Sequence, residues 1–464
     1  MKRSGRYSFF ALCTWLAIAA TPAAAESKTS ATPLLIRNAT LVDGTGDAPK
    51  SGIDILVVNG KIASVGPKLA APARTKIVDA TGKFVTPGLI DAHVHLHFPT
   101  LFQLTEDERA KVIAHTPKAF LYNGVTTILN VSSPKDWIIA QRQAQRDGRL
   151  VAPRIYALGH SFTPEKGWGS RHGGALSDAA AARAKAEEYV ASNLDGFKIV
   201  IEDGLGSHGT HVEMPEDMLF AIVDVAKANA MKMYVHAMNL HEFKRAVAIK
   251  AQSVIHGLED PLPEGDSLIA DMVNNNVAIV HTASLFRSFL GPDPRVGANL
   301  DDPVLVGSVP AFMLAKMRSV AFMDEEKALF SKASMMDAYA WAREHNPNIC
   351  ENIGKMHRGG VKTAVGTDAG GTVGYNFQGY NTPWEVKILT ECGLTPMEAL
   401  VAATRNGAEV IGVADTLGTV EPGKIADMLI LSADPLQNIE NIRAIEWIVQ
   451  DGKLHPRNEF AYRP

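Results

Sequence analysis

The sequence has no cluster of lysine and arginine, no internal repeat and no low-complexity tract. With a net charge of -4, such a chain has little electrostatic attraction for nucleic acid or an anionic membrane, so we expect neither as a partner. Hydrophobic residues make up 46% and charged residues 21%, which excludes disordered and fibrous proteins. A small-molecule role is the default expectation, and whether the chain forms a homo-oligomer stays open.

A long hydrophobic run occurs only near the beginning of the sequence. Three basic residues precede an apolar run over residues 9–20, and small residues follow up to Ala25. This layout is typical of a cleaved secretory signal and is too short for a spanning helix. We therefore expect residues 1–25 to be removed and the protein to be exported, most simply to the periplasm, without a stable membrane anchor.

Cysteine is scarce, with three residues in 464. Cleavage after Ala25 would leave Cys350 and Cys392, and an oxidising compartment permits them to pair. A domain of this size rarely needs a disulfide to fold. We therefore favour two free buried thiols.

Short strand-like stretches bounded by glycine, proline and aspartate occupy both ends of the chain. Each cluster alone has too few strands for a stable core, so we expect the two to join in one small β-sandwich. This assigns residues 26–86 and 416–464 to the sandwich, and residues 87–415 to a different middle domain.

The middle of the chain alternates short apolar strands with helical stretches, which is the pattern of a parallel α/β fold. The candidate strands are Ile90 to His95, Thr126 to Val131, Arg154 to Leu158, Phe197 to Ile201, Met233 to His236, Ser253 to His256, Val277 to His281 and Val361 to Thr367. Eight strand-helix units suit a (β/α)8 TIM-like barrel. We expect residues 284–352 to form an elaborated loop with helices over the barrel mouth.

Polar side chains stand at the carboxyl ends of several predicted strands, where barrel enzymes place their chemistry. The candidate metal ligands are His93, His95, Lys198, His236, His256 and Asp368. A single histidine at a strand end is more often structural, but a set at matching ends of separate strands is not explained that way. Imidazole and carboxylate groups suit zinc or a similar divalent ion.

Lys198 lies in a strand whose alternation points its side chain into the barrel. An ammonium group beside bound dications is electrostatically untenable. A neutral amine could instead add carbon dioxide and become a carbamate that bridges two metal ions. The alternative is a structural pair between Lys198 and Glu202, which share one face of the strand.

Several motifs together resemble the amidohydrolase superfamily, in its binuclear prolidase-like and imidazolonepropionase-like branch. The motifs are Thr86-Pro-Gly-Leu-Ile-Asp-Ala-His-Val-His95, Lys198, Val235-His236, Val254-Ile-His256-Gly257, Gly366-Thr-Asp368-Ala-Gly370, Thr395-Pro-Met-Glu-Ala-Leu400 and Gly418-Thr-Val-Glu-Pro-Gly-Lys-Ile-Ala-Asp427. The resemblance covers nearly all of the chain after residue 25. It is specific for the superfamily and weakly specific for the substrate.

The resemblance implies a two-metal centre, with zinc as the expected metal. One ion would be held by His93, His95, carboxylated Lys198 and Asp368, and the other by Lys198, His236 and His256. A hydroxide bridging the two ions would attack an amide carbonyl, and Asp368 would carry the proton to the departing amine. Dipeptides or N-acyl amino acids are the expected substrates.

Four residues are candidates for substrate contact, namely Arg171, His172, Tyr234 and His281. The first two lie in a loop that resembles a substrate-contacting loop of the family, where an arginine could hold a carboxylate. Tyr234 faces inward by strand parity. The chain also departs from the branch, with Met238 at a common tyrosine position, Gln378 at a frequent histidine position and His281 where proline is usual.

Other functions on the same fold stay open. Deamination or cyclic amide opening at a single metal is disfavoured by Asn239, where deaminases typically carry glutamate, and by Lys198. A lactonase or esterase activity would use the same nucleophile. An inactive binding protein is disfavoured because every ligand position is filled.

Overall fold

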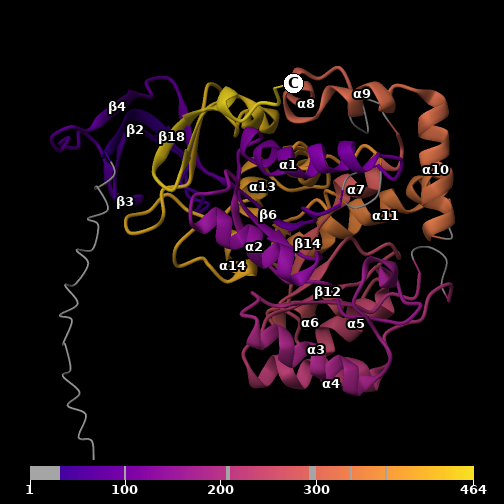
Figure 1. Cartoon of the computed structure of the whole chain (residues 1–464). Helices are drawn as coiled ribbons and strands as arrows, with labels where there is room; N and C mark the ends of the chain where they lie inside the picture. The colour runs from indigo at the N-terminus through magenta and orange to yellow at the C-terminus, as the bar shows by residue number, and fades with distance from the viewer. Residues whose placement is uncertain are drawn as a thin grey trace, which may run out of the picture. The chain divides into compact units, whose positions relative to one another are not determined.

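The computed structural model describes residues 32–98, 101–204, 209–291, 299–334, 337–370 and 374–463 (Figure 1). Within these ranges, the side chains of His172, Ala333 and Ser334 are not described. The expected signal segment, residues 1–25, lies outside them. No helix of the described ranges is long and apolar enough to cross a membrane.

Strands from both ends of the chain share one eight-stranded sheet in the order β18-β17-β16-β5-β1-β2-β3, with β4 paired to β1. The strands are β1 (Leu34–Leu41), β2 (Lys50–Val58), β3 (Lys61–Gly66), β4 (Lys76–Asp79), β5 (Phe84–Pro87), β16 (Met428–Leu431), β17 (Ile445–Gln450) and β18 (Lys453–Pro456). Antiparallel pairing of β5 with β16 joins the two halves, drawn in indigo and yellow in Figure 1. The joining of the two terminal clusters is therefore confirmed.

A small core of its own stabilises this sheet. Ile36, Ile55, Met428 and Val449 from four of its strands are buried together. Strand alternation sends Met428 and Ile430 of β16 into this core, whereas Leu429 and Leu431 on the other face of β16 belong to the larger core of the chain. The sheet thus has a hydrophobic core distinct from that of the barrel.

The middle of the chain supplies eight parallel strands in two sheets, β6-β7-β8 and β11-β12-β13-β14-β15. They are β6 (Leu89–Val94), β7 (Val125–Asn130), β8 (Arg154–Ala157), β11 (Phe197–Val200), β12 (Met233–His236), β13 (Ser253–Ile255), β14 (Ala278–His281) and β15 (Thr363–Val365). Parallel bridges from Phe162 to Ile199 and from Val94 to Ala369 join the two sheets at both sides and close the ring. All eight predicted barrel strands are present, and the fold is an α/β barrel with an attached sheet.

Helices cover the outside of the ring, because each strand alternates between an inner and an outer apolar face. The helices are α1 (Glu106–Tyr122), α2 (Lys135–Arg146), α3 (Ala179–Ala191), α4 (Glu216–Ala228), α5 (Leu240–Ala248), α6 (Leu268–Asn274), α7 (Ala283–Ser288), α8 (Pro303–Ser308), α9 (Ala311–Met317), α10 (Val320–Ser334), α11 (Ala338–Arg358), α12 (Asn381–Glu391), α13 (Pro396–Ala402) and α14 (Arg405–Ile411). Short elements complete the described chain: β9 (Thr163–Pro164), β10 (Ala175–Leu176), and the 3-10 turns η1 (Ser170–His172), η2 (Ile439–Arg443) and η3 (Arg457–Glu459). Capping boxes at Thr105, Asn239 and Thr395 fix where three of the helices begin.

The long interval at residues 284–352 is helical in its described parts, as expected. Its helices α8 and α9 share a hydrophobic cluster with Leu101, Leu104 and Val112 of the segment after β6. On α10, the buried Glu326 accepts hydrogen bonds from the backbone N–H groups of Phe102 (2.9 Å) and Gln103 (2.8 Å). The insertion therefore packs on the segment that follows His93 and His95.

Cys350 and Cys392 form a disulfide, so the expectation of two free thiols is wrong. Cys350 lies in α11 and Cys392 caps the end of α12. The reason is tertiary, since packing of α11 against α12 brings together two residues that are 42 positions apart in sequence.

Candidate metal centre

The ends of five barrel strands bring the six predicted metal ligands together. The residues are His93 and His95 at β6, Lys198 in β11, His236 at the end of β12, His256 after β13 and Asp368 after β15. Four of the side chains are buried, and those of His95 and Asp368 are 15% and 16% exposed. The centre is therefore most accessible at His95 and Asp368.

Asp368 lies against both histidines of β6. Its Oδ1 is 3.0 Å from His93 Nε2 and 2.7 Å from His95 Nε2, so three atoms that can bind a metal ion converge. The second nitrogen of His95, Nδ1, is 3.3 Å from the carbonyl oxygen of Ser132, and this contact orients the ring. Burial alone would raise the pKa of Asp368, but the two imidazoles hold it well below its usual range.

His236 and His256 form a second donor pair, with His236 Nδ1 only 2.8 Å from His256 Nε2. Glu202 contacts the other nitrogen of His236, Nε2, and a carboxylate there requires the proton on Nε2. The other nitrogen of His256, Nδ1, lies 2.8 Å from the hydroxyl of Thr282. Burial lowers the pKa of both imidazoles well below 6.5.

The facing nitrogens of this pair suit a cation. His236 protonated on Nε2 presents the lone pair of Nδ1 to His256, and a His256 that donates from Nδ1 to Thr282 presents the lone pair of Nε2 in return. Two lone pairs at this separation repel each other unless a positive charge lies beside them. The donor set therefore fits a bound divalent metal ion.

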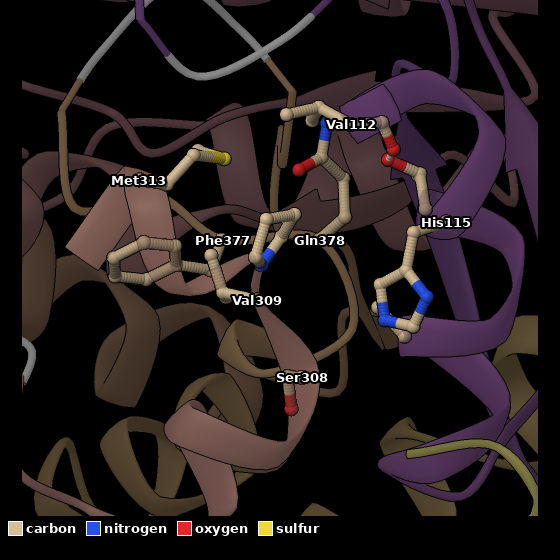
Figure 2. Close-up of a pocket in the computed structure, with 10 residues that line it drawn as sticks. Val112, His115, Ser308, Val309, Met313, Phe377 and Gln378 are labelled. Carbon is tan, nitrogen blue, oxygen red and sulfur yellow. Dashed lines mark hydrogen bonds between the residues drawn. The ribbon is translucent and has the colours of Figure 1, made fainter. Parts of the chain in front are cut away.

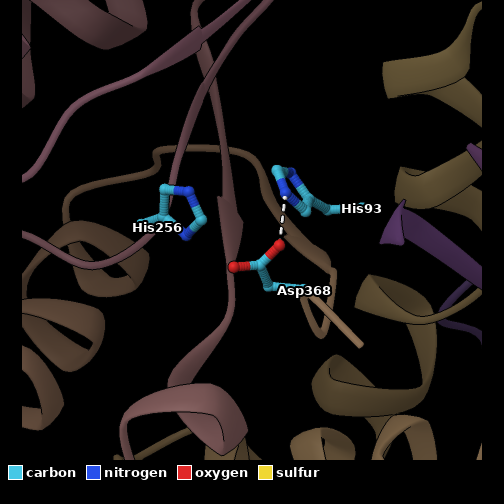
Figure 3. A group of neighbouring side chains, drawn as sticks. All are labelled: His93, His256 and Asp368. Atoms are coloured by element: carbon cyan, nitrogen blue, oxygen red, sulfur yellow. Dashed lines mark hydrogen bonds and ion pairs between the residues drawn. The ribbon is translucent and has the colours of Figure 1, made fainter. Parts of the chain in front are cut away.

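The two groups form one centre. Ligand atoms of His93, His256 and Asp368 all lie within 4.8 Å of one another (Figure 3). The ring of His256 is 5.0 Å from that of His93 and 4.2 Å from that of His236. His256 thus adjoins both donor groups, as a site for neighbouring ions requires.

Lys198 lies among these ligands with 3% of its surface exposed. Its Nζ has no hydrogen-bond partner among the described residues, which is costly for a buried amine. Burial lowers the pKa of Lys198 to about 7, against the opposing effect of Asp368 and Glu202. A neutral, unpartnered amine at this place is what addition of carbon dioxide requires.

Glu202, Thr282 and Asp91 support the ligands, and the sequence prediction gave them no such role. Asp91 is fully buried; its Oδ1 accepts the backbone N–H of His93 (3.2 Å) and its Oδ2 accepts the hydroxyl of Thr367 (2.8 Å). Burial raises the pKa of Asp91 to about 7. Strand parity could have suggested that Glu202 lies near the ligands, because Glu202 shares a strand face with Lys198. Parity could not have shown that Glu202 contacts His236.

Two of the predicted substrate contacts lie elsewhere. Tyr234 is fully buried, and its hydroxyl donates to the carbonyl of Val410 (3.1 Å), because it lies two residues deeper in the barrel than His236. His281 shares strand parity with Ile279, whose side chain belongs to the outer, helix-facing core. Burial lowers the pKa of His281 to about 3. We correct both predictions on these grounds.

The other two predicted contacts lie in the loop after β8. Arg171 is exposed on η1, and the side chain of His172 lies outside the described structure. The next loop meets this one, since the N–H of Val212 donates to the carbonyl of Lys166 (3.1 Å). The ring of His211 packs edge-on against Trp168, 5.3 Å away. Burial, with the nearby Arg171 guanidinium, lowers the pKa of His211, a residue absent from the predicted site.

A separate, narrow pocket lies between α1 and the α8–α9 segment (Figure 2). Its lining includes Val112, His115, Met313, Phe377 and Gln378, and none of the six predicted ligands. The amide nitrogen of Gln378 donates to the carbonyl of Phe98 (2.9 Å), whose ring packs near His95. The pocket thus adjoins the segment after β6, beside the centre.

Comparison with known proteins identifies the fold and the family. A family model described as the amidohydrolase family matches residues 84–454. The dihydroorotase of Pelotomaculum thermopropionicum is 24% identical over 429 residues, which cover 88% of this chain and 91% of that enzyme.

Two solved structures have the same fold as this chain. A Xaa-Pro dipeptidase solved with methionine in its active site has a TM-score of 0.73 and 22% identity, covering 92% of this chain and 100% of that one. A putative prolidase from Bifidobacterium longum has a TM-score of 0.72 and 24% identity, covering 91% and 94%. At these identities the likeness extends to the fold alone.

Proposed function

The chain belongs to the amidohydrolase family, and on this premise we propose that it hydrolyses dipeptides or N-acyl amino acids at a centre of two divalent metal ions. The observation that carries the proposal is the convergence of Asp368 with two histidines on one side and of His236 with His256 on the other. The unpartnered amine of Lys198 lies among them.

We assign the ligands by these two groups. His93, His95 and Asp368 would hold one ion, and His236 and His256 the other, with carboxylated Lys198 shared between them. Imidazole and carboxylate ligands with open positions suit catalytic zinc. When bound, such ions lower the pKa of a water molecule and polarise a carbonyl oxygen.

Asp368 is the base in this proposal. Its neighbours His93 and His95 favour its anionic form, and its partial exposure places it at the accessible side of the centre. A carboxylate there can accept a proton from the attacking water and return it to the departing amine. Glu202 and Thr282 keep the imidazoles of His236 and His256 in the orientation that the ligands need.

A substrate with a free carboxylate agrees with the adjoining loops. Arg171 is the only one of the four predicted contacts that is exposed and described, and His211 lies near it. A guanidinium can hold a carboxylate through two parallel hydrogen bonds. The likeness in fold to a Xaa-Pro dipeptidase supports peptides as the first substrate class to test.

The match to a dihydroorotase favours a second candidate, the opening of a cyclic amide. The same carbonyl chemistry serves both reactions, so the pocket and not the centre would decide between them.

We also propose that the protein is exported. The basic, apolar and small-residue pattern of residues 1–25 is that of a signal segment. The disulfide between Cys350 and Cys392 agrees with an oxidising compartment. Amino-terminal sequencing of protein recovered from a periplasmic fraction tests this proposal.

The decisive experiment pairs elemental analysis with a substrate library. Protein prepared with zinc and bicarbonate should hold about two metal ions per chain, and it should release amino acids from dipeptides or N-acyl amino acids. The variant Asp368→Asn should lose turnover in the same assay. Full turnover after removal of the metal would refute the proposal, and turnover of cyclic amides alone would select the second candidate.

A further inference from the structure

Helix α12 presents buried polar side chains to the barrel, although it lies in the outer layer. Asn381, Thr382 and Glu385 are all fully buried in its first turns. Buried hydroxyl, amide and carboxyl groups persist only where they have partners. Each of these three has its partner in, or next to, the segments that carry the metal ligands.

Thr382 reaches the segments of the first donor group. Its hydroxyl donates to Asp91 Oδ2 at 2.7 Å, and the hydroxyl of Thr367 donates to the same oxygen at 2.8 Å. The other oxygen of Asp91 accepts the backbone N–H of His93 at 3.2 Å. Thr382 therefore fixes a carboxylate that ties His93 to the residue preceding Asp368.

Glu385 reaches the segment that supports the second donor group. Its Oε1 accepts the N–H of Ala283 (3.0 Å) and its Oε2 accepts the N–H of Ser284 (2.6 Å), so both oxygens hold the start of α7. Thr282 comes directly before this start, and its hydroxyl lies 2.8 Å from His256 Nδ1. Glu385 thereby fixes the backbone that orients the partner of His256.

Asn381 adds a third connection. Its amide donates to Asn376 Oδ1 at 2.7 Å, and the amide of Asn376 donates to the carbonyl of Asp368 at 3.0 Å. One end of one helix thus contacts the supports of His93, His256 and Asp368.

We propose that α12 is the common support of both halves of the metal centre, with Thr382 positioning His93 and Asp368, and Glu385 positioning His256. The inference rests on the proposed two-metal function. Neither residue is a ligand or touches the reacting atoms. Replacing either residue should therefore weaken the retention of metal and lower kcat, and it should leave KM little changed.

Valine in place of Thr382 keeps the shape and removes the hydroxyl, whereas Thr382→Ser keeps the hydroxyl. The matched control is Thr390→Val on the same helix, since the hydroxyl of Thr390 donates to the carbonyl of Lys387 within its own helix. For Glu385→Gln the control is Glu391→Gln, whose carboxylate meets Lys387 and Arg287 near the surface.

The measurement is competition of a chelator for zinc in the loaded full-length protein, followed by kcat and KM. Loss of a group that orients a ligand typically weakens metal binding about 10- to 100-fold. We expect that loss in Thr382→Val and Glu385→Gln, and retention close to wild type in Thr382→Ser and both controls. Thermal unfolding of the metal-free forms identifies a variant that fails to fold.

Two results would overturn the inference, and a third would overturn the proposed function on which it rests. Zinc retention by folded Thr382→Val equal to wild type would show that the hydroxyl has no positioning role. Equal loss of zinc in Thr382→Ser and Thr382→Val would show that the loss does not depend on the hydroxyl group. Wild-type protein that binds no zinc would remove the two-metal function itself, whereas wild-type zinc binding with unaffected variants would refute the role of α12 alone.

Discussion

Replacing Lys185 by methionine should change how stability depends on pH. Lys185, in α3, donates hydrogen bonds from Nζ to the carbonyls of Ser161 (2.7 Å) and Gly174 (2.8 Å), at the two ends of the loop that carries Arg171. Its Nζ lies 4.8 Å from the centre of the Phe162 ring. No carboxylate of the described residues lies within ion-pair distance of it, and burial lowers the pKa of Lys185 from 10.5 to about 7.

The sign of the effect follows from proton binding. Between pH 7 and 10.5 the unfolded chain holds the Lys185 proton and the folded protein has released it. The unfolded state therefore binds more protons, and the free energy of unfolding rises with pH across this window. One pH unit well inside this window corresponds to about 1.4 kcal/mol, and since the folded group is half protonated at pH 7, the rise between pH 6 and pH 9 is about 3 kcal/mol.

The assay is urea unfolding of wild type and Lys185→Met at pH 6 and pH 9. The difference between the two proteins at each pH cancels every other titrating group, and it should grow in favour of wild type by about 3 kcal/mol from pH 6 to pH 9. Arg183→Met, on the same helix and 46% exposed, is the control and should give no such growth. A change below about 1 kcal/mol, or one of opposite sign, would refute the reasoning.

Three further predictions concern other parts of the molecule. Replacing both Cys350 and Cys392 by serine opens a loop spanning 42 positions and should lower the free energy of unfolding by about 4 kcal/mol. A denaturant titration measures this loss, and a value under about 1 kcal/mol would contradict the prediction. Glu202→Gln removes the carboxylate that contacts His236 and should weaken zinc binding about 10-fold or more in chelator competition; binding equal to wild type would contradict this role of Glu202. Arg171→Gln should raise KM about 10- to 100-fold for substrates with a free carboxylate and leave their esters unaffected, which steady-state kinetics on matched pairs would decide.

The ligand set could be predicted from sequence because parallel barrel strands all end at the same face. His93 and His95 share a strand face by alternation, and His236 ends its own strand, so no long-range information was needed to bring them together. Tyr234 shows what alternation leaves out. It lies on the same strand face as His236, but two residues of strand are about 7 Å, which puts it one layer deeper in the packed barrel.

The supporting contacts could not be predicted in this way. Glu385 and Thr382 occur in a helix far along the chain from the strands that they hold, and their partners are fixed by packing of that helix on the barrel. Pairing of Cys350 with Cys392 depends on the same helix packing. Local pattern describes strands and their ends, whereas these contacts depend on how elements distant in sequence meet.

The disulfide and the metal supports occupy opposite ends of α12, and this separation distinguishes their effects. Ten residues divide Thr382 from Cys392, which in an α-helix is about 15 Å. The contacts of Thr382 and Glu385 lie in the first turns and are made to Asp91 of β6 and to the start of α7, neither of which contains a cysteine. A crosslink acts mainly by restricting the unfolded chain, and it leaves such native contacts in place when it is broken. Reduction should therefore lower the free energy of unfolding while the folded protein keeps its affinity for metal.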